Sequence, residues 1–129
     1  MIDQRVSTGN AWELRYGYSR AVRAGNLVFT TGTVSMNPDA TPYTPDDGFT
    51  QATRCLEIIE RSIGELGATK SDIVRTRFYV TDIARGDEFG RAHRAFFDQH
   101  APALTMVGVA KLVDPAFLVE IECEAVIGG

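Results

Sequence analysis

The sequence predicts one α+β domain in which two helices pack on one face of a mixed sheet, with the element order ββαβαββ. Three patterns predict this class: an early tight hairpin, two helical stripes of apolar residues, and a final strand whose apolar residues recur at every second position. The chain has 129 residues, of which 44% are hydrophobic. That length suits a single domain over residues 1–129 with its own core.

The first two strands are predicted over residues 13–23 and 26–34. Between them lies the turn Ala24-Gly25-Asn26, where glycine and asparagine tolerate the positive φ angles of a tight hairpin. Residues 37–48 then gather three prolines, three aspartates and a glycine. This composition predicts an ordered surface loop ahead of a helix.

The first long helix is predicted to follow this loop, with Asp46 or Asp47 as its N-cap. Its apolar residues recur at the three- and four-residue spacing of one helical face, and Gly67 supplies a left-handed stop. The stripe consists of Ala52, Cys55, Leu56, Ile59, Ile63 and Leu66.

A third strand is predicted over residues 73–81, followed by a second helix for which Asp87 is the candidate cap. The buried stripe of this helix would be Phe89, Ala92, Phe96 and Phe97. The last two strands, over residues 104–112 and 117–127, are predicted to pair with each other around Asp114-Pro115.

The final strand has one apolar and one acidic face. Positions 117, 119, 121, 123, 125 and 127 are small or apolar, whereas Glu120, Glu122 and Glu124 share the opposite parity. Three carboxylates in a row repel one another unless they meet water, cations or a site that uses them. Because Arg77 and Tyr79 also share a parity, the face away from the helices is expected to mix charged, aromatic and apolar groups. This mixture is typical of an oligomer interface that contains a cleft.

The charge balance argues against nucleic acid as a partner. A formal net charge of -4 and a pI near 5.1 leave no cluster of lysines and arginines to neutralise phosphates. No basic segment followed by an apolar run opens the chain, and no stretch approaches the length of a membrane span. We therefore expect a cytoplasmic protein without membrane or nucleic-acid partners.

Cysteine and histidine give no sign of a metal site. Cys55 and Cys123 each lie on a predicted apolar face, which favours buried thiols over a disulfide. His93 and His100 have no set of Cys, Asp or Glu at metal-ligand spacing, and we expect both on the surface. No metal and no other cofactor is predicted.

Three segments carry a family resemblance that covers most of the chain. They are Tyr18–Gly32, Val74–Asp82, and Pro102-Ala103 followed by Val119–Glu122. Together they resemble the RidA/YjgF/YER057c/UK114 family. The resemblance implies a chorismate-mutase-like fold and a homotrimer, with an inner barrel of three sheets, outer helices and three clefts between subunits. It also implies hydrolysis of reactive enamines and imines, such as 2-aminoacrylate, to a ketoacid and ammonia.

The resemblance also assigns roles to individual positions. Glu120 stands where the family's glutamate positions the attacking water, and Tyr18 stands at the tyrosine of its Tyr-Ser motif. Thr31-Gly32 stands where the family commonly has Ser-Gly. The family's carboxylate-binding arginine follows the Pro-Ala pair, and this chain has Leu104 there.

Leu104 puts the family's reaction in doubt for this chain and places it with branches that lack the arginine. A hydrogen bond to a charged group is worth ~1.5–3 kcal/mol, and leucine offers none. A cleft lined by Leu104 and Met106, which replaces a cysteine of several relatives, favours a more apolar or uncharged ligand. Gly90 stands where some relatives have asparagine. The expected ligand contacts are Tyr18, Thr31, Gly32, Leu104, Thr105, Met106 and Arg77.

Two alternatives remain open at the sequence level. Arg77 could supply a displaced cation for the ligand, or it and Arg75 could pair across strands with Glu122 and Glu124. Residues 12–16, with Trp12 and Tyr16, could cover the cleft mouth or anchor the N-terminus on a neighbour.

The residues and the resemblance together suggest three functions. The first is a trimeric deaminase-like hydrolase of a small enamine or imine, with Glu120 as general base and the Thr31-Gly32 backbone assisting. The second is a non-catalytic trimer that binds a small metabolite as a sensor or scaffold. The third is an endoribonuclease, which the acidic charge balance disfavours.

Overall fold

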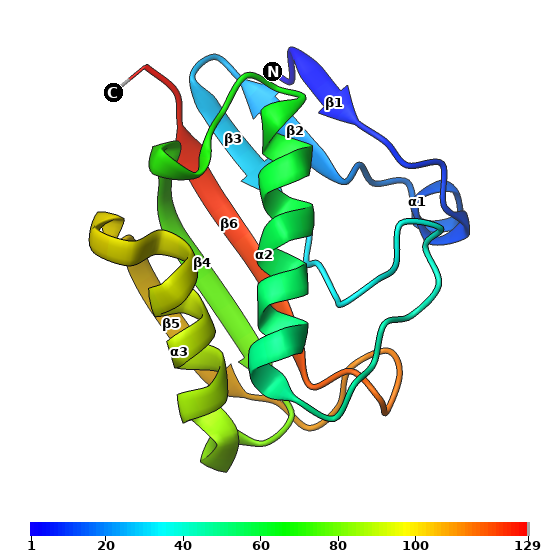
Figure 1. Ribbon diagram of the computed structural model, residues 1–129. Helices are drawn as coiled ribbons and strands as arrows, with labels where there is room; N and C mark the ends of the chain where they lie inside the picture. Colours follow the sequence, from blue (N-terminus) through cyan, green and yellow to red (C-terminus); the bar gives the residue numbers. More distant parts are fainter. Residues whose placement is uncertain (129) are drawn as a thin grey trace.

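Six strands form one mixed sheet in the computed structural model, which describes residues 1–128 (Figure 1). The strand order is β1-β2-β3-β6-β4-β5. β4 and β5 are parallel, whereas every other neighbouring pair is antiparallel. The strands are β1 (Gln4–Val6), β2 (Ala21–Ala24), β3 (Leu27–Thr30), β4 (Ile73–Val80), β5 (Ala103–Gly108) and β6 (Val119–Val126).

The two long helices lie side by side over one face of this sheet, as predicted (Figure 1). They are α2 (Gly48–Gly64) and α3 (Gly86–Phe97). A short helix, α1 (Ala11–Tyr16), lies beyond the β1 side of the sheet. Three single-turn 3-10 helices occupy Lys70–Asp72, Ile83–Arg85 and Asp98–His100. The fold class predicted from the sequence is confirmed.

The core lies between the helices and the sheet. Every residue of the predicted α2 stripe is buried there, and the β6 residues of odd number from Val119 to Ala125 meet it from the sheet side. Burying one of the leucine, isoleucine or valine side chains fully contributes about 1.5–3 kcal/mol. We name the opposite surface of the sheet, which carries Glu120, Glu122 and Glu124, the open face.

The predicted helix boundaries hold for α2. Asp47 is its N-cap, and the side chain accepts a hydrogen bond from the Phe49 backbone N–H at 3.0 Å. After the last turn, Gly67 adopts φ +88°, and the Ala68 N–H donates to the Ile63 carbonyl at 3.0 Å. A residue with a side chain would be strained at that φ, so the glycine lets the chain turn back toward the sheet.

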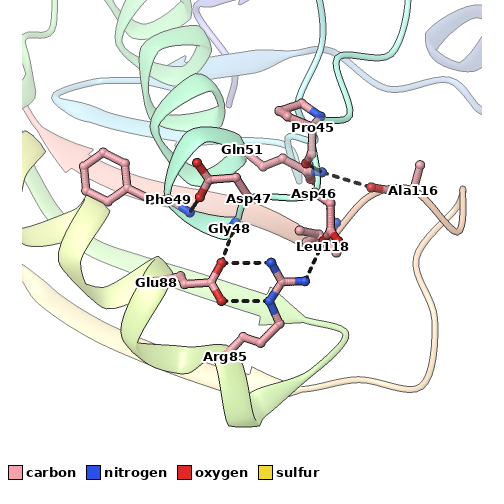
Figure 2. Close-up of polar contacts among 10 residues, drawn as sticks. All are labelled: Pro45, Asp46, Asp47, Gly48, Phe49, Gln51, Arg85, Glu88, Ala116 and Leu118. Atoms are coloured by element: carbon pink, nitrogen blue, oxygen red, sulfur yellow. Dashed lines mark hydrogen bonds and ion pairs between the residues drawn. The ribbon is translucent and has the colours of Figure 1, made fainter.

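A polar cluster joins the starts of α2 and α3 to the segment before β6 (Figure 2). Glu88 accepts a hydrogen bond from the Gly48 backbone N–H at 2.8 Å. It also accepts two hydrogen bonds from the Arg85 guanidinium, one from Nε and one from Nη2. Arg85 also bonds Asp46 at 2.8 Å. Gln51, fully buried, donates to the carbonyls of Pro45 and Ala116 and accepts from Leu118, each at 2.9 Å. These contacts fix the loop ends that precede both helices.

The prediction of one continuous strand over residues 13–23 is wrong. A six-residue helix, α1, occupies part of that range, and β2 covers only its last residues. Asn10 caps α1 by accepting from the Glu13 N–H, and Gly17 at φ 73° ends it. Neither cap was recognised, and β1 (Gln4–Val6) was not predicted because three residues are too few to show a period.

The pairing predicted for the last two strands is also wrong. β5 pairs only with β4, as a parallel edge strand, while β6 enters the sheet between β3 and β4. The cause is the crossover through α3, which makes β4 and β5 parallel neighbours. β4 itself has a bulge between Ile73 and Arg75, so Val74 is exposed instead of sharing the buried parity.

Two further expectations on α3 are corrected. Asp87 is not its cap but lies in its first turn, where it pairs with Arg91 at 2.9 Å. His93 is buried at 7% exposure and bonds Thr76 at 2.9 Å, because it shares the sheet-facing stripe with Phe89. Both cysteines are buried and free. No helix within residues 1–128 has the length and apolarity to cross a membrane.

Candidate functional site

The three glutamates of the open face have three different environments. Glu124 forms an ion pair with Arg77 at 2.8 Å, which for Arg77 is the cross-strand pairing and not the ligand contact of the two alternatives given by the sequence. Glu122 accepts a hydrogen bond from the Tyr79 hydroxyl, which raises the pKa of that phenol. Within residues 1–128, the carboxylate of Glu120 forms no hydrogen bond and no ion pair. Glu120 thus differs from Glu122 and Glu124, whose side chains have partners on β4.

Glu120 is partly buried and lies against the backbone of Gly32. A Cβ built on Gly32 would stand 2.1 Å from Oε2 of Glu120 and 3.0 Å from its carboxyl carbon. Gly32 does not adopt a positive φ, so its requirement for glycine comes from this close approach and not from backbone strain.

The strand pairing opens where Gly32 meets Glu120. β3 pairs with β6 up to Phe29, and the chain rejoins β6 at Thr33, which exchanges two backbone hydrogen bonds with Ile121 at 2.7 and 2.9 Å. Gly32 lies within this interruption. The gap in the ladder leaves room for the Glu120 side chain beside the backbone of residues 31–32.

The segment of residues 18–20 is tied to the same place. Thr31 donates its N–H to the Arg20 carbonyl at 3.0 Å and its hydroxyl to the Ser19 carbonyl at 2.6 Å. These bonds bring the Tyr18 segment beside Gly32. Of the residues selected from the sequence, Gly32 and Glu120 are in direct contact and Thr31 adjoins them, whereas Tyr18 precedes the bonded segment of Ser19 and Arg20.

Arg20 belongs to this site and was not selected from the sequence. Its Nη2 donates to the Gly32 carbonyl at 2.7 Å, and its Nε is buried without a hydrogen-bond partner. The available signal was its position two residues after Tyr18. That signal was weak, because a strand residue of an exposed hairpin is often a solvent-facing arginine.

Burial and charge act against each other at Glu120. Partial burial raises the pKa of its carboxyl above the usual 4.5, the positive charge of Arg20 opposes this, and the negative charge of Glu122 adds to it. A carboxylate with a raised pKa and no bound partner is suited to taking a proton from a water molecule.

The β5 residues predicted to contact ligand do not all reach the face of Glu120. Leu104 and Met106 are in register with Thr76 and Phe78, whose side chains are buried under the helices, so they lie on the helix side of the sheet. Thr105 falls on the open face. Within one chain, Leu104 and Glu120 therefore lie on opposite faces, and they can meet only across two copies of the chain.

Leu104 lies at the sheet edge, 40% exposed, over a small cavity of about 180 Å³. The cavity lies between α3 and the start of β5. Its lining consists of Gly90, His93, Arg94, Phe97, Asp98, Ala101, Pro102 and Leu104. Burial lowers the pKa of His93, so its imidazole is held in the neutral form. The surroundings of Leu104 are thus largely uncharged, apart from Arg94 and Asp98 at the rim.

Trp12 and Tyr16 stack on each other with ring centroids 5.6 Å apart, and both are largely exposed on α1. The helix is fixed beneath them by Glu13, which is 3% exposed and accepts hydrogen bonds from Ser7 and Thr8. No group of three or more His, Cys, Asp or Glu side chains within residues 1–128 is arranged to hold a metal ion.

Comparisons with known proteins agree on one family. The family model described as Endoribonuclease L-PSP matches residues 8–127. A solved structure from Mycobacterium tuberculosis, a member of the YjgF/YER057c/UK114 family, is 43% identical with a TM-score of 0.87 and covers 96% of this chain and 98% of its own.

Two sequence relatives match at similar length. An uncharacterized protein of Streptomyces coelicolor is 33% identical over 122 residues, covering 95% of this chain and 90% of the relative. The 2-iminobutanoate/2-iminopropanoate deaminase of Escherichia coli is 30% identical over 128 residues, covering 97% of each. All three are similar to this chain across nearly its whole length.

Proposed function

Because the chain belongs to the RidA/YjgF/YER057c/UK114 (endoribonuclease L-PSP) family, we propose that it is a deaminase-like hydrolase of a small enamine, imine or related compound, with Glu120 as its general base. The reaction site is a cleft between subunits of a homotrimer. Leu104 makes 2-aminoacrylate a poor substrate and favours a less charged one.

One observation carries the proposal: Glu120 is the unpartnered carboxylate of the three on the open face. Its neighbours Glu122 and Glu124 are occupied by Tyr79 and Arg77, which leaves them little capacity to accept a proton from water. The Glu120 carboxylate is partly buried, has no hydrogen-bond partner within residues 1–128, and has a raised pKa. These are properties that suit a general base.

The proposed reaction begins with a water molecule hydrogen-bonded to Glu120. Its oxygen bonds to the imine carbon while Glu120 takes one of its protons, and the electrons of the C=N bond move to nitrogen. Glu120 then returns the proton to the nitrogen. The product of this addition is a carbinolamine. Glu120 then takes the proton of its hydroxyl group and passes it to the amino nitrogen as the C–N bond breaks, so ammonia leaves and the oxygen becomes the carbonyl of the product. Water is consumed, and Glu120 ends in its starting state.

The open face supports the homotrimer. Four of its apolar side chains, from β3, β5 and β6, are exposed by 38–46% in the single chain, more than their hydrophobicity favours. They are Leu27, Phe29, Val107 and Val126. They surround the charged rows of β4 and β6, which is the mixed composition of a subunit interface. A second copy would also bring its own Leu104 toward the Glu120 side.

A non-catalytic, metabolite-binding trimer is the second candidate, and Leu104 is the observation that favours it. Its side chain offers no charged hydrogen bond to orient a substrate carboxylate, and the cavity beneath it suits an apolar group. Endoribonuclease activity is disfavoured, because a net charge of -4 provides no phosphate-binding surface.

The experiment compares wild type with Glu120→Gln, using imines generated in situ from small amino acids and measuring ammonia release. Glu122→Gln is the matched control, since it removes a neighbouring carboxylate on the same strand face. We expect Glu120→Gln to abolish turnover while remaining trimeric by light scattering. Full activity in Glu120→Gln would rule out Glu120 as the general base. A retained, chemically unchanged ligand with no product from any imine would favour the binding trimer.

A further inference from the structure

We propose that Arg20 is a positioning residue for Glu120: it holds the Gly32 backbone against which the carboxylate lies and supplies the positive charge beside it. The inference rests on the proposed role of Glu120 as general base. It concerns a residue that neither the sequence patterns nor the family motif singled out.

The geometry links the two side chains through Gly32. Arg20 Nη2 donates to the Gly32 carbonyl at 2.7 Å, and the backbone of Gly32 is in close contact with the Glu120 carboxyl group. The Arg20 carbonyl accepts a hydrogen bond from the N–H of Thr31, the residue that directly precedes Gly32. Arg20 thus restrains the backbone on one side of Glu120 by two bonds, one from its side chain and one to its main chain.

The buried Nε of Arg20 indicates that this placement has a cost. A buried N–H without an acceptor loses its hydrogen bond to water and gains none in the fold. The negative charges of Glu13 and Glu120 offset this cost, because both attract the positive charge of the Arg20 guanidinium. Glu13 already accepts three hydrogen bonds from Ser7 and Thr8, whereas Glu120 has none.

The groups around Glu120 come from three elements and from the segment that precedes β2. Arg20 precedes β2, Tyr79 is on β4, Glu122 is on β6, and Cys55 of α2 is a buried thiol whose own pKa is raised in part by Glu120. Arg20 is the cation among them. Without it, both remaining influences on Glu120, burial and the charge of Glu122, favour the protonated and catalytically inactive form.

The test measures protonation of Glu120 directly, apart from activity. Carboxyl carbons of glutamate are labelled with ¹³C, Glu120 is assigned through Glu120→Gln, and its titration is followed in wild type, Arg20→Gln and Arg20→Lys. Arg23→Gln is the control, since Arg23 lies on β2, directly after the segment of Arg20, and its side chain also donates to backbone carbonyls, those of Gly25 and Leu66. The pH dependence of kcat/KM is recorded for the same proteins.

We expect Arg20→Gln to shift the Glu120 titration to higher pH, with a loss of kcat/KM on the order of tenfold at acidic pH that shrinks in alkaline buffer. Arg20→Lys should restore the titration but not the full kcat, because an ammonium lacks the planar fork that reaches Gly32. Arg23→Gln should match wild type in both measurements.

An unchanged Glu120 titration in folded Arg20→Gln would overturn the proposal, whatever its activity. If Arg20→Gln does not fold, Arg20→Lys decides, since a wild-type kcat in that variant would also overturn it. If no protein turns over any imine, the general-base function fails while the titration still answers the question about Arg20. The two proposals can therefore fail separately.

Discussion

The Glu120 carboxylate occupies the space that any side chain at Gly32 would need. The distance of 2.1 Å between Oε2 and a Cβ built on Gly32 is far below a van der Waals contact. The two residues are 88 positions apart in the chain, yet the absence of a side chain at one sets the position of the other's functional group. This contact explains why the residue after Thr31 is a glycine.

We predict that Gly32→Ala leaves the protein folded but impairs its reaction. The new methyl group meets the far end of a flexible side chain, so Glu120 can move aside at a cost of about 1 kcal/mol. A displaced base should lower kcat/KM by on the order of tenfold to a hundredfold. The measurements are thermal unfolding and ammonia release.

Gly64→Ala is the matched control, because a Cβ at Gly64 meets nothing within 4 Å. It should leave activity unchanged and raise stability by roughly 0.5–1 kcal/mol, as expected for alanine in place of a helical glycine. Wild-type turnover in Gly32→Ala would contradict the contact as a determinant of the site.

Leu104→Arg should improve turnover of 2-iminopropanoate, the hydrolysable form of 2-aminoacrylate. Leu104 is 40% exposed, so the longer side chain fits without disrupting the core. A new guanidinium–carboxylate contact of ~1.5–3 kcal/mol corresponds to roughly a tenfold to hundredfold gain in kcat/KM. Leu104→Lys should gain less, because it supplies charge without the bidentate geometry. Equal rates for all three proteins would show that position 104 does not contact the substrate carboxylate.

His93 should make the folded state less stable in acid. Burial lowers its pKa in the folded protein below the usual 6.5, so below that pH the unfolded chain binds more protons than the folded one. The stability from its neutral form is fully present above pH 6.5 and is lost as the pH falls toward the folded pKa. His93→Gln should flatten this slope in urea unfolding series.

Thr76→Val provides the control for His93. It removes the hydrogen bond at 2.9 Å and should cost about 1 kcal/mol at every pH, while the imidazole and its slope remain. An unchanged slope in His93→Gln would assign the acid sensitivity to other groups.

Glu88 should stabilise the folded state at neutral pH and lose this contribution in acid. Hydrogen bonds from Arg85, together with the Gly48 N–H, lower its pKa from 4.5 to about 2. Because the folded pKa is depressed, the stabilisation is present above pH 4.5 and is lost as the pH falls toward 2. Glu88→Gln should therefore unfold at lower temperature at neutral pH, with a smaller further loss in acid.

Asp87→Asn tests whether that effect belongs to the cluster in Figure 2 or to acidic charge in general. Asp87 directly precedes Glu88 in sequence and pairs with the exposed Arg91. An exposed pair of this kind contributes little, so its removal should change the unfolding temperature much less. Equal losses in the two variants would contradict a specific role for Glu88.

The sequence determined which residues face the core in the long elements. The two-residue period of β6 and the stripe of α2 assigned buried and open sides correctly, because side-chain direction within an element follows from local backbone geometry. It also identified Thr31-Gly32 and Glu120 through the family motif, and the structure brings them together. Short elements such as α1 and β1 were missed because they contain too few residues to show a period.

Only the tertiary structure decided how the elements meet. Strand order, the insertion of β6 between β3 and β4, and the separation of Leu104 from Glu120 on opposite faces depend on pairings between distant segments. The same is true of Arg20, whose importance comes from the Gly32 carbonyl at 2.7 Å and not from its sequence neighbours. Periodicity reports which side of an element is apolar, but register and contact partners are fixed by long-range packing, which no local pattern contains.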